Sequence, residues 1–239
     1  MKKKVLLSAV CLALALGSAS YAKSGVFVGA NAGLAITTPS YLNELKDNKS
    51  MLPDTGVGYV LGLDAGYQQN FTPKMGLRYY LSYNFSQSFA SKTNAISLSN
   101  GVEGTSGSTK ATQTFETINF NHLVAANVDF FYNVTDMFGA YVGLGAGFSN
   151  FSIDMKSTIL VPGEGSDSQT IKFAGNSFAL PLNVGVSMNL GEHQVVKLGA
   201  KIPLLGTDIK ASDKNAFGSD KAQATLRNYI IQVGYSYMF

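Results

Sequence analysis

The sequence is poor in charge, cysteine and tryptophan. Only 14% of its 239 residues are charged, one is cysteine and none is tryptophan. An ordinary soluble domain has about 25% charged residues. The low and balanced charge excludes an acidic disordered chain and a strongly basic nucleic-acid binder. With two histidines and one cysteine, the chain offers no cluster of metal ligands, and we expect neither a metal nor a cofactor.

Long hydrophobic runs are also missing. Beyond the first 22 residues no apolar stretch reaches 18 residues, and a transmembrane helix needs about 20, so we expect no such helix. Instead the chain has 25 glycines, 12 tyrosines and 15 phenylalanines. Little charge combined with many glycines and aromatics is typical of a β-barrel whose outer face meets lipid.

The N-terminus has the pattern of an export signal. Lys2–Lys4 are positive, Val5–Leu16 are apolar, and the small residues Ser20 and Ala22 precede a predicted cleavage site. We therefore predict a signal peptide over residues 1–22. Its removal takes away Cys11, so the mature chain has no disulfide, and it leaves 15 basic groups to balance the 15 acidic ones. The charge thus indicates no anionic partner.

From residue 23 onward, apolar residues recur with the period of two that is typical of strands. In the clearest segment Met75, Leu77 and Tyr79 alternate with Gly76 and Arg78. Each such segment has about the 9–11 residues that a tilted strand needs to cross a membrane. Eight segments share this pattern: 26–36, 58–68, 75–86, 124–133, 138–149, 178–189, 196–204 and 228–239.

The connections alternate between short and long. Tight turns are expected at 70–74, 133–137 and 191–194, and long polar loops near 37–56, 87–117, 152–176 and 206–224. An even number of strands with this asymmetry predicts that residues 23–239 form one all-β domain. This domain is an eight-stranded antiparallel transmembrane β-barrel with short periplasmic turns and long extracellular loops.

A soluble β-sandwich or lipocalin-like barrel also alternates, but it places charged residues on its water-facing side. Here the polar face is mostly Gly, Ser and Asn, and the apolar face is unbroken and ends in Tyr and Phe. This pattern favours the membrane barrel, because only a closed sheet satisfies every backbone amide in hydrocarbon.

Several segments resemble one family. The C-terminus Tyr235-Ser-Tyr-Met-Phe239 is similar to the signal that outer-membrane barrels present to the machinery that inserts them. The segment 178–205, which ends in Lys201-Ile-Pro-Leu-Leu205, resembles the penultimate hairpin of the Helicobacter outer membrane protein family. Gly76–Tyr80 and Arg227–Tyr229 also resemble that family.

The resemblance implies a barrel in the outer membrane of a Gram-negative bacterium. Its partners are then outer-membrane lipid and the barrel-assembly machinery, with Tyr235, Tyr237 and Phe239 as the insertion signal. Large members of the family carry a cysteine-containing extracellular head after the first strand, whereas here about 20 residues follow that strand and none is cysteine. The adhesin role of those members therefore does not transfer, and no extracellular ligand is implied.

The strand pattern directs five charged residues into the barrel. A charge enclosed in a small barrel is costly unless it is paired, so one interpretation is a network of ion pairs and hydrogen bonds that fills the lumen. The other is the charged lining of a narrow, weakly anion-preferring pore. The first is favoured, because the lumen of an eight-stranded barrel is just wide enough for side chains. The five residues are Asp64, Arg78, Asp129, Lys197 and Lys201.

Two further patterns have the residue types of a nucleotide-binding or a catalytic site. The glycines at alternate positions through 139–147 look like a dinucleotide loop, but no helix follows, and we expect them to make room for Arg78 and Tyr80. His122 shares an outward face with Val124, and Ser152 and Asp154 have the parity to lie beside it. Such a set would hydrolyse lipid esters, but no motif frames the serine and a girdle histidine is the simpler interpretation.

Together these observations predict a non-enzymatic surface protein of the outer membrane, with a role in envelope structure or in loop-mediated surface contact. A narrow porin-like channel for small solutes is the alternative. An outer-leaflet lipid hydrolase comes third.

Overall fold

The computed structural model describes residues 24–42, 46, 49–99, 108–211 and 223–239. The predicted signal peptide lies outside this range. The described chain is almost entirely strand, with one short 3₁₀ helix, η1 (Lys49–Met51). The strands are β1 (Gly25–Leu42), β2 (Gly56–Thr72), β3 (Met75–Ser99), β4 (Ser108–Asn133), β5 (Phe138–Val161), β6 (Gly165–Ala179), β7 (Pro181–Asn189), β8 (Gln194–Pro203), β9 (Thr207–Ala211) and β10 (Gln223–Met238).

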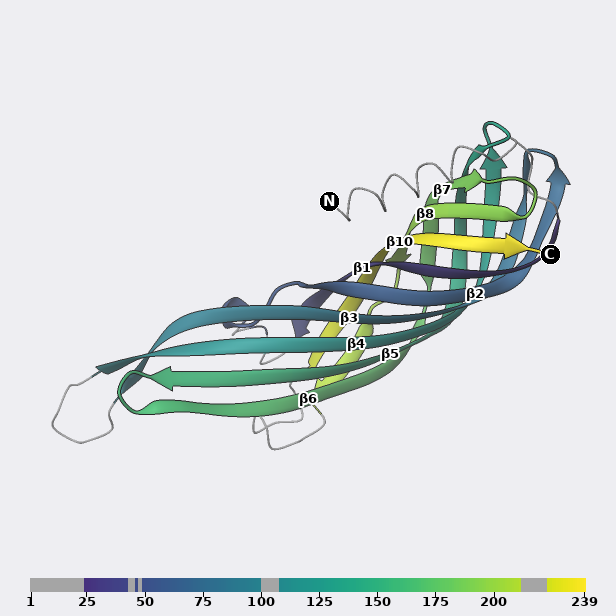
Figure 1. The fold of residues 1–239 in the computed structure, drawn as a ribbon. Helices are drawn as coiled ribbons and strands as arrows, with labels where there is room; N and C mark the ends of the chain where they lie inside the picture. The colour runs from purple at the N-terminus through teal and green to yellow at the C-terminus, as the bar shows by residue number, and fades with distance from the viewer. Residues whose placement is uncertain (1–23, 43–45, 47–48, 100–107, 212–222) are drawn as a thin grey trace, which may run out of the picture.

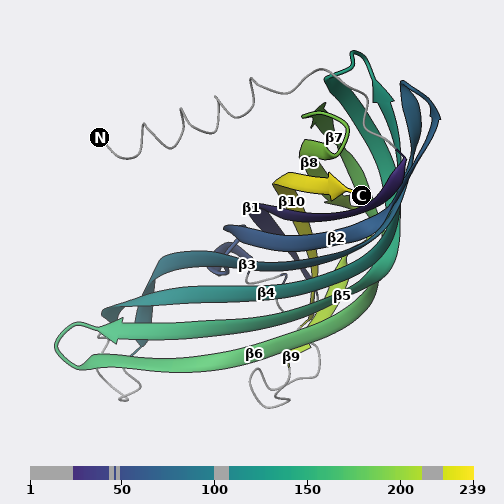
Figure 2. The same cartoon turned by 45° about the vertical axis from the view of Figure 1, so that its right-hand side comes forward.

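The strands close into one antiparallel ring. β1 pairs with β2 on one side and with β10 on the other, so the sheet has no free edge along its closed part. β6 and β7 both pair with β5, and β8 and β9 both pair with β10. Each of these two pairs is one wall strand interrupted at a single place, which leaves eight wall strands (Figures 1 and 2). The predicted eight-stranded antiparallel barrel is confirmed.

The outer face of the ring is apolar around one end of the molecule. Leu63, Leu81 and Leu144 all point outward and are more than half exposed. Aromatic pairs border this zone on the side away from the tight turns, where Phe148 and Phe178 meet edge to face with ring centroids 6.1 Å apart. Such a band with aromatic borders is the surface that a transmembrane barrel presents to lipid.

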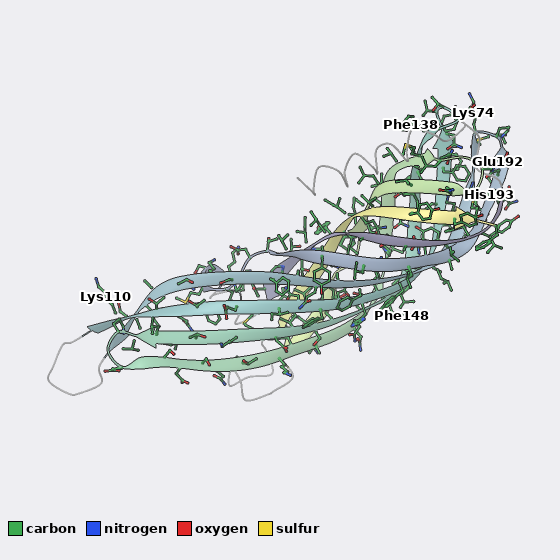
Figure 3. The ribbon with its side chains drawn as sticks, in the orientation of Figure 1. Lys74, Lys110, Phe138, Phe148, Glu192 and His193 are labelled. Carbon is green, nitrogen blue, oxygen red and sulfur yellow. The ribbon has the colours of Figure 1, made fainter. Side chains whose placement is uncertain are left out.

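The tight turns gather at one end of the ring. Lys74, Phe138, Glu192 and His193 lie together there, and Lys110 lies at the far opposite end (Figure 3). The strands are much longer than predicted at this opposite end. β3, β4, β5 and β6 run through most of the residues that were expected to be long loops, and only Pro162–Glu164 separate β5 from β6. The expectation of long loops at 87–117 and 152–176 was therefore wrong for the described residues.

The part of β3–β6 beyond Phe89 and Phe173 forms a projecting sheet (Figure 1). Its strands pair with one another as far as Ser99↔Ser108 and Val161↔Gly165. On the side of β3 away from β4, from Ala90 onward, and on the side of β6 away from β5, before Phe173, no further strand of the described residues pairs. We call these two sides the open edges of the projecting sheet. The β3 edge is contacted by side chains alone, with Asn94 Nδ2 donating to Met51 O at 2.8 Å.

The apolar side of β5 changes along its length. In β5 the outward Leu144 and Phe148 are exposed to the membrane zone, but further along the inward Phe151, Ile153 and Met155 are buried. The outward residues then become Ser152, Asp154 and Lys156. Apolar and polar residues still alternate, but the apolar residues now point into the barrel and the polar residues point outward. This change is expected where a barrel leaves lipid and enters water. The reversal near residue 150 marks the outer membrane boundary.

Candidate functional site: the barrel lumen

A cluster of polar side chains fills the lumen within the membrane zone. Asn183 of β7 lies at its centre and donates through Nδ2 to Asp129 Oδ1 at 3.0 Å and to Asn127 Oδ1 at 3.0 Å. The Tyr80 hydroxyl donates to the other oxygen of Asp129 at 2.8 Å. All four residues are buried. The cluster joins β3, β4 and β7 on one side of the lumen, where Gly143 of β5 lies between Asp129 and Asn183 in the strand pairing.

The cations of the lumen have unequal partners. Lys197 Nζ lies 3.5 Å from Asp64 Oδ2, which makes a buried ion pair. Arg78 Nε donates to Gln68 Oε1 at 2.6 Å, and its guanidinium lies 4.9 Å from the centre of the Phe131 ring. These contacts place both side chains firmly against the wall.

Lys201, like Arg78, has a neutral amide oxygen and an aromatic ring as its described partners. Its Nζ donates to Asn183 Oδ1 at 3.1 Å and lies 5.6 Å from the Tyr80 ring centre. The structure therefore brings Asp129 and Lys201 into contact with the central Asn183, and it pairs Asp64 with Lys197. Arg78 is held through Gln68. Parity along the strands also places Gln68 and Asn183 inside, so the sequence pattern could have found these two partners.

Glycines of β5 make room for neighbours on β4. A Cβ at Gly143 would lie 2.2 Å from Asp129 Oδ1, and one at Gly145 would lie 2.4 Å from Asn127 Oδ1. The expectation that these glycines accommodate Arg78 and Tyr80 was therefore wrong. Their neighbours are set by the pairing of β4 with β5, in which Gly143 lies opposite Asp129. No helix follows β5, so the dinucleotide loop is excluded here as expected.

Beyond the membrane zone the lumen contains an apolar cluster beside a group of buried polar residues, in which Ser88 Oγ donates to Thr37 Oγ1 at 2.8 Å and Asn119 Nδ2 donates to Ser88 Oγ at 3.2 Å. Phe151, Ile153, Met155, Phe173 and Leu226 belong to one buried cluster that also includes Leu52 from the segment after β1. Tyr41 packs against this cluster and donates to Pro53 O at 2.6 Å. Burial raises the pKa of the Tyr41 hydroxyl, and the nearby Asp54 carboxylate raises it further. The outer half of the barrel thus has a core like that of a soluble β protein.

His122, Ser152 and Asp154 do not form a catalytic set. His122 Nδ1 lies 2.9 Å from the Tyr83 hydroxyl, and the imidazole packs on Phe85 with ring centres 5.1 Å apart. In the β4–β5 pairing His122 lies opposite Asn150, whereas Ser152 and Asp154 lie opposite Phe120 and Ile118. No hydrogen bond within the described chain joins His122 to either. His122 is a residue of the aromatic girdle.

The C-terminal aromatics lie on the outside of the barrel. Tyr235, Tyr237 and Phe239 point outward and are exposed, and Phe239 is the most exposed of the three at 70%. The Tyr237 ring stacks on His193, with centres 5.9 Å apart, and His193 Nδ1 lies 2.8 Å from Met238 O. The last strand is thereby fixed to the turn between β7 and β8.

Metal-binding groups and membrane-spanning helices are both absent from the described residues. These residues contain no group of three or more His, Cys, Asp or Glu side chains placed to hold a metal. In the same part of the chain, no helix is long and apolar enough to cross a membrane.

A closed antiparallel ring with an apolar outer band, aromatic borders and a polar lumen defines the class of outer-membrane β-barrels. Within this class, the sequence matches the profile of Helicobacter outer membrane proteins over residues 62–239. The chain belongs to that family, as its resemblance indicated, and it resides in the outer membrane of a Gram-negative bacterium.

Solved structures of other barrels are similar over most of their length. Neisserial surface protein A is 16% identical, with 90% of this chain and 98% of that chain covered and a TM-score of 0.43. OprG from Pseudomonas aeruginosa is 16% identical, with 91% and 98% covered and a TM-score of 0.44. The outer membrane protease OmpT from Escherichia coli is 9% identical, with 93% and 100% covered and a TM-score of 0.49. A search of curated proteins gives no match. The identities are too low to carry over an activity.

Proposed function

We propose that the protein is a non-enzymatic surface protein whose barrel is sealed and whose projecting sheet makes contacts outside the cell. The observation that carries this proposal is the pair of open edges on the projecting sheet, at β3 from Ala90 and at β6 before Phe173. An open edge offers unpaired backbone groups to which an extended peptide or a second sheet can add as a further strand. The polar outward side chains keep this sheet soluble.

The polar cluster supports the sealed lumen. Asp129, Asn183 and Tyr80 are linked by hydrogen bonds of 2.8–3.3 Å on one side of the lumen. The ion pair between Lys197 of β8 and Asp64 of β2 crosses the lumen, and the apolar cluster around Phe151 lies beyond them. A solute would have to displace both layers. The proposed role of Asp64, Arg78, Asp129, Lys197 and Lys201 is thus a network that stiffens the barrel, and a narrow porin-like channel is the second candidate.

Conductance separates the two candidates. The refolded protein is added to a planar bilayer beside Asp129→Ala, which removes the carboxylate between Tyr80 and Asn183. A sealed barrel gives no discrete openings in the unmodified protein. Discrete openings whose size or ion preference changes in Asp129→Ala would instead establish the channel, with the five lumen charges as its lining.

The projecting sheet is tested by its exposure and by its removal. Because Cys11 is the only cysteine, single cysteines can be labelled cleanly on intact cells with a membrane-impermeant maleimide. Ser168→Cys, on the open β6 edge, should react, and Thr135→Cys, in the turn between β4 and β5, should not.

Removal of the sheet tests its role in contact. A variant lacking residues 92–114 and 157–169 keeps the closed ring and loses both open edges. Cells that display the full chain should aggregate and sediment faster than cells that display this variant at equal abundance. Equal sedimentation would reject contact through the projecting sheet.

We also propose that Tyr235, Tyr237 and Phe239 present the last strand to the barrel-assembly machinery. Their rings lie on the outer face at the end of β10 and leave the folded lumen untouched. The Phe239 ring contacts Tyr237 at a ring distance of 5.3 Å, and its backbone N–H donates to Val26 O at 2.9 Å, a bond that any residue at this position can make.

A further inference from the structure

The two open edges of the projecting sheet differ in what covers them. On the β3 edge, Lys92 Nζ lies 3.4 Å from Asp54 Oδ2, and Asn94 Nδ2 donates to Met51 O. On the β6 edge, every residue of 165–170 is exposed, whichever face of the strand it occupies. The β6 edge is therefore the more accessible of the two within the described chain.

The β6 edge lacks the devices that usually block an open strand. Natural sheets protect such edges with prolines, bulges or several charges. The segment 166–171 has no proline and a single charged residue, Asp167, and its pairing with β5 contains no bulge. Ser168 N donates to the carboxylate of this same Asp167 at 2.8 Å, so its amide has a local acceptor where a further strand would supply one. A strand that adds here replaces this local bond.

The direction of β6 determines where an antiparallel partner copy would be anchored. β6 runs from the far end of the projecting sheet back toward the embedded ring (Figure 1). A second copy in the same membrane presents its own β6 in the same direction, whereas a copy in the membrane of a facing cell presents it in the opposite direction. Antiparallel ladders are slightly more stable per residue than parallel ones. Pairing of two β6 edges therefore favours copies on facing cells.

The charges of the β5–β6 hairpin are complementary in such a pair. When the two-fold axis passes through Ser168, this residue lies opposite its own copy, and Glu164 of the turn lies opposite Lys172 of the second copy at both ends. Glu164 and Lys172 are exposed, and neither belongs to an ion pair among the described residues. This register also ends before Phe173, so the pairing of Phe173 with Ala211 is undisturbed. The edge thus matches a second copy of itself in length and in charge.

We propose that the β6 edges of two copies on facing cells pair antiparallel about Ser168 and hold the cells together. The partner of the projecting sheet is then a second copy of this chain. The inference rests on the proposed surface contact and names its partner. One such pair of edges is short, so a single contact is weak, and the many copies on each cell supply the avidity. The test is therefore made on whole cells that display the full chain.

Charge substitutions at the axis test the pairing. Ser168→Lys places two lysines directly opposite each other, and like charges in that position destabilise a strand pair. Cells that display Ser168→Lys should sediment as slowly as cells that display the variant without the projecting sheet, and so should Ser168→Asp cells. A mixture of Ser168→Lys cells and Ser168→Asp cells should aggregate again, because opposite charges then meet. Thr158→Lys is the matched control, since Thr158 lies opposite Ser168 on β5, one strand away from the edge, and it should leave sedimentation unchanged.

The composition of the aggregates identifies the partner. Fluorescent cells that lack the protein are added to cells that display the full chain, and we expect the aggregates to exclude them. Their inclusion would show contact with another surface molecule, which overturns pairing between copies and leaves the proposed surface contact standing.

Equal surface abundance and heat-modifiable mobility in gels verify that each variant is displayed and folded. The inference is also overturned if Ser168→Lys cells sediment as fast as unmodified cells, or if the mixture of Ser168→Lys and Ser168→Asp cells stays dispersed. If unmodified cells sediment no faster than cells without the projecting sheet, the proposed surface contact is rejected together with this inference.

Discussion

Asp129 offers the sharpest test of the polar cluster. Replacing it by alanine removes two hydrogen bonds to a charged acceptor, one from the Tyr80 hydroxyl and one from Asn183 Nδ2. Both donors are buried. The Tyr80 hydroxyl would lose the carboxylate to which it donates, whereas Asn183 Nδ2 would keep Asn127 Oδ1 at 3.0 Å. Hydrogen bonds to charged groups contribute about 1.5–3 kcal/mol each, so Asp129→Ala should lower the free energy of unfolding by about 3–6 kcal/mol.

The assay is urea unfolding of the protein refolded in lipid vesicles, followed by tyrosine fluorescence and by gel mobility. Asp129→Asn keeps an acceptor at Oδ1 and removes the charge, so its loss should be smaller than that of alanine. Asp154→Ala is the matched control, because this carboxylate lies on the outward face of β5 beyond the membrane zone and surface substitutions usually change stability by less than about 0.5 kcal/mol. A loss below about 1 kcal/mol for Asp129→Ala would refute a cluster that stabilises the barrel.

Three further predictions concern the lipid-facing side of β3, the buried hydroxyl of Tyr41 and the C-terminal Phe239. Leu81→Arg puts a charge on the lipid face and should lower the free energy of unfolding by about 2–4 kcal/mol near the bilayer midplane. The same unfolding assay should show almost no loss for Thr158→Arg, which points outward from the projecting sheet. An equal loss for both variants would contradict the reversal of the apolar face. Tyr41→Phe should leave the tyrosinate absorbance unchanged around pH 10, where exposed tyrosines titrate, because the raised pKa of Tyr41 keeps it neutral there. The neutral hydroxyl therefore contributes to the free energy of unfolding below its ordinary pKa, and this contribution is lost as the pH rises toward the raised pKa. A lower tyrosinate absorbance at about pH 10 in Tyr41→Phe than in the unmodified protein would show that Tyr41 titrates normally. Phe239→Ala should reduce the amount of folded barrel in the membrane of living cells and leave the unfolding free energy of the refolded protein nearly unchanged, whereas a large loss of stability in vitro would indicate a structural role instead.

The strands and their lipid-facing sides could be predicted because the period of two is visible in residues such as Leu77, Tyr79 and Leu81. The same period was present in Phe151-Ser-Ile-Asp-Met155, but the polar residues there were interpreted as loop. In water the apolar side turns inward, so polar outward residues are what a continuing strand requires. The reversed alternation was the missed signal.

The contacts within the lumen could be predicted only in part. Parity directs Asp129, Asn183 and Lys201 inward, but which of them meet depends on how far neighbouring strands are staggered. No residue pattern fixes that stagger, and so the glycines of β5 were assigned to Arg78 and Tyr80 in place of Asp129 and Asn127. The interruption of the wall between β6 and β7 depends on the same stagger. Pro181 and Pro203 mark the interruption in the sequence, but only the pairing of β7 with β8 brings them face to face.

The reversal of the apolar face along β5 has a consequence for how such a protein can change in length. The ladder between β4 and β5 runs through the membrane boundary without interruption. Adding two residues to each strand of a hairpin beyond residue 150 preserves every side-chain direction, because the strand repeat is two. The surface portion can therefore lengthen or shorten in pairs of residues while the embedded ring keeps its register.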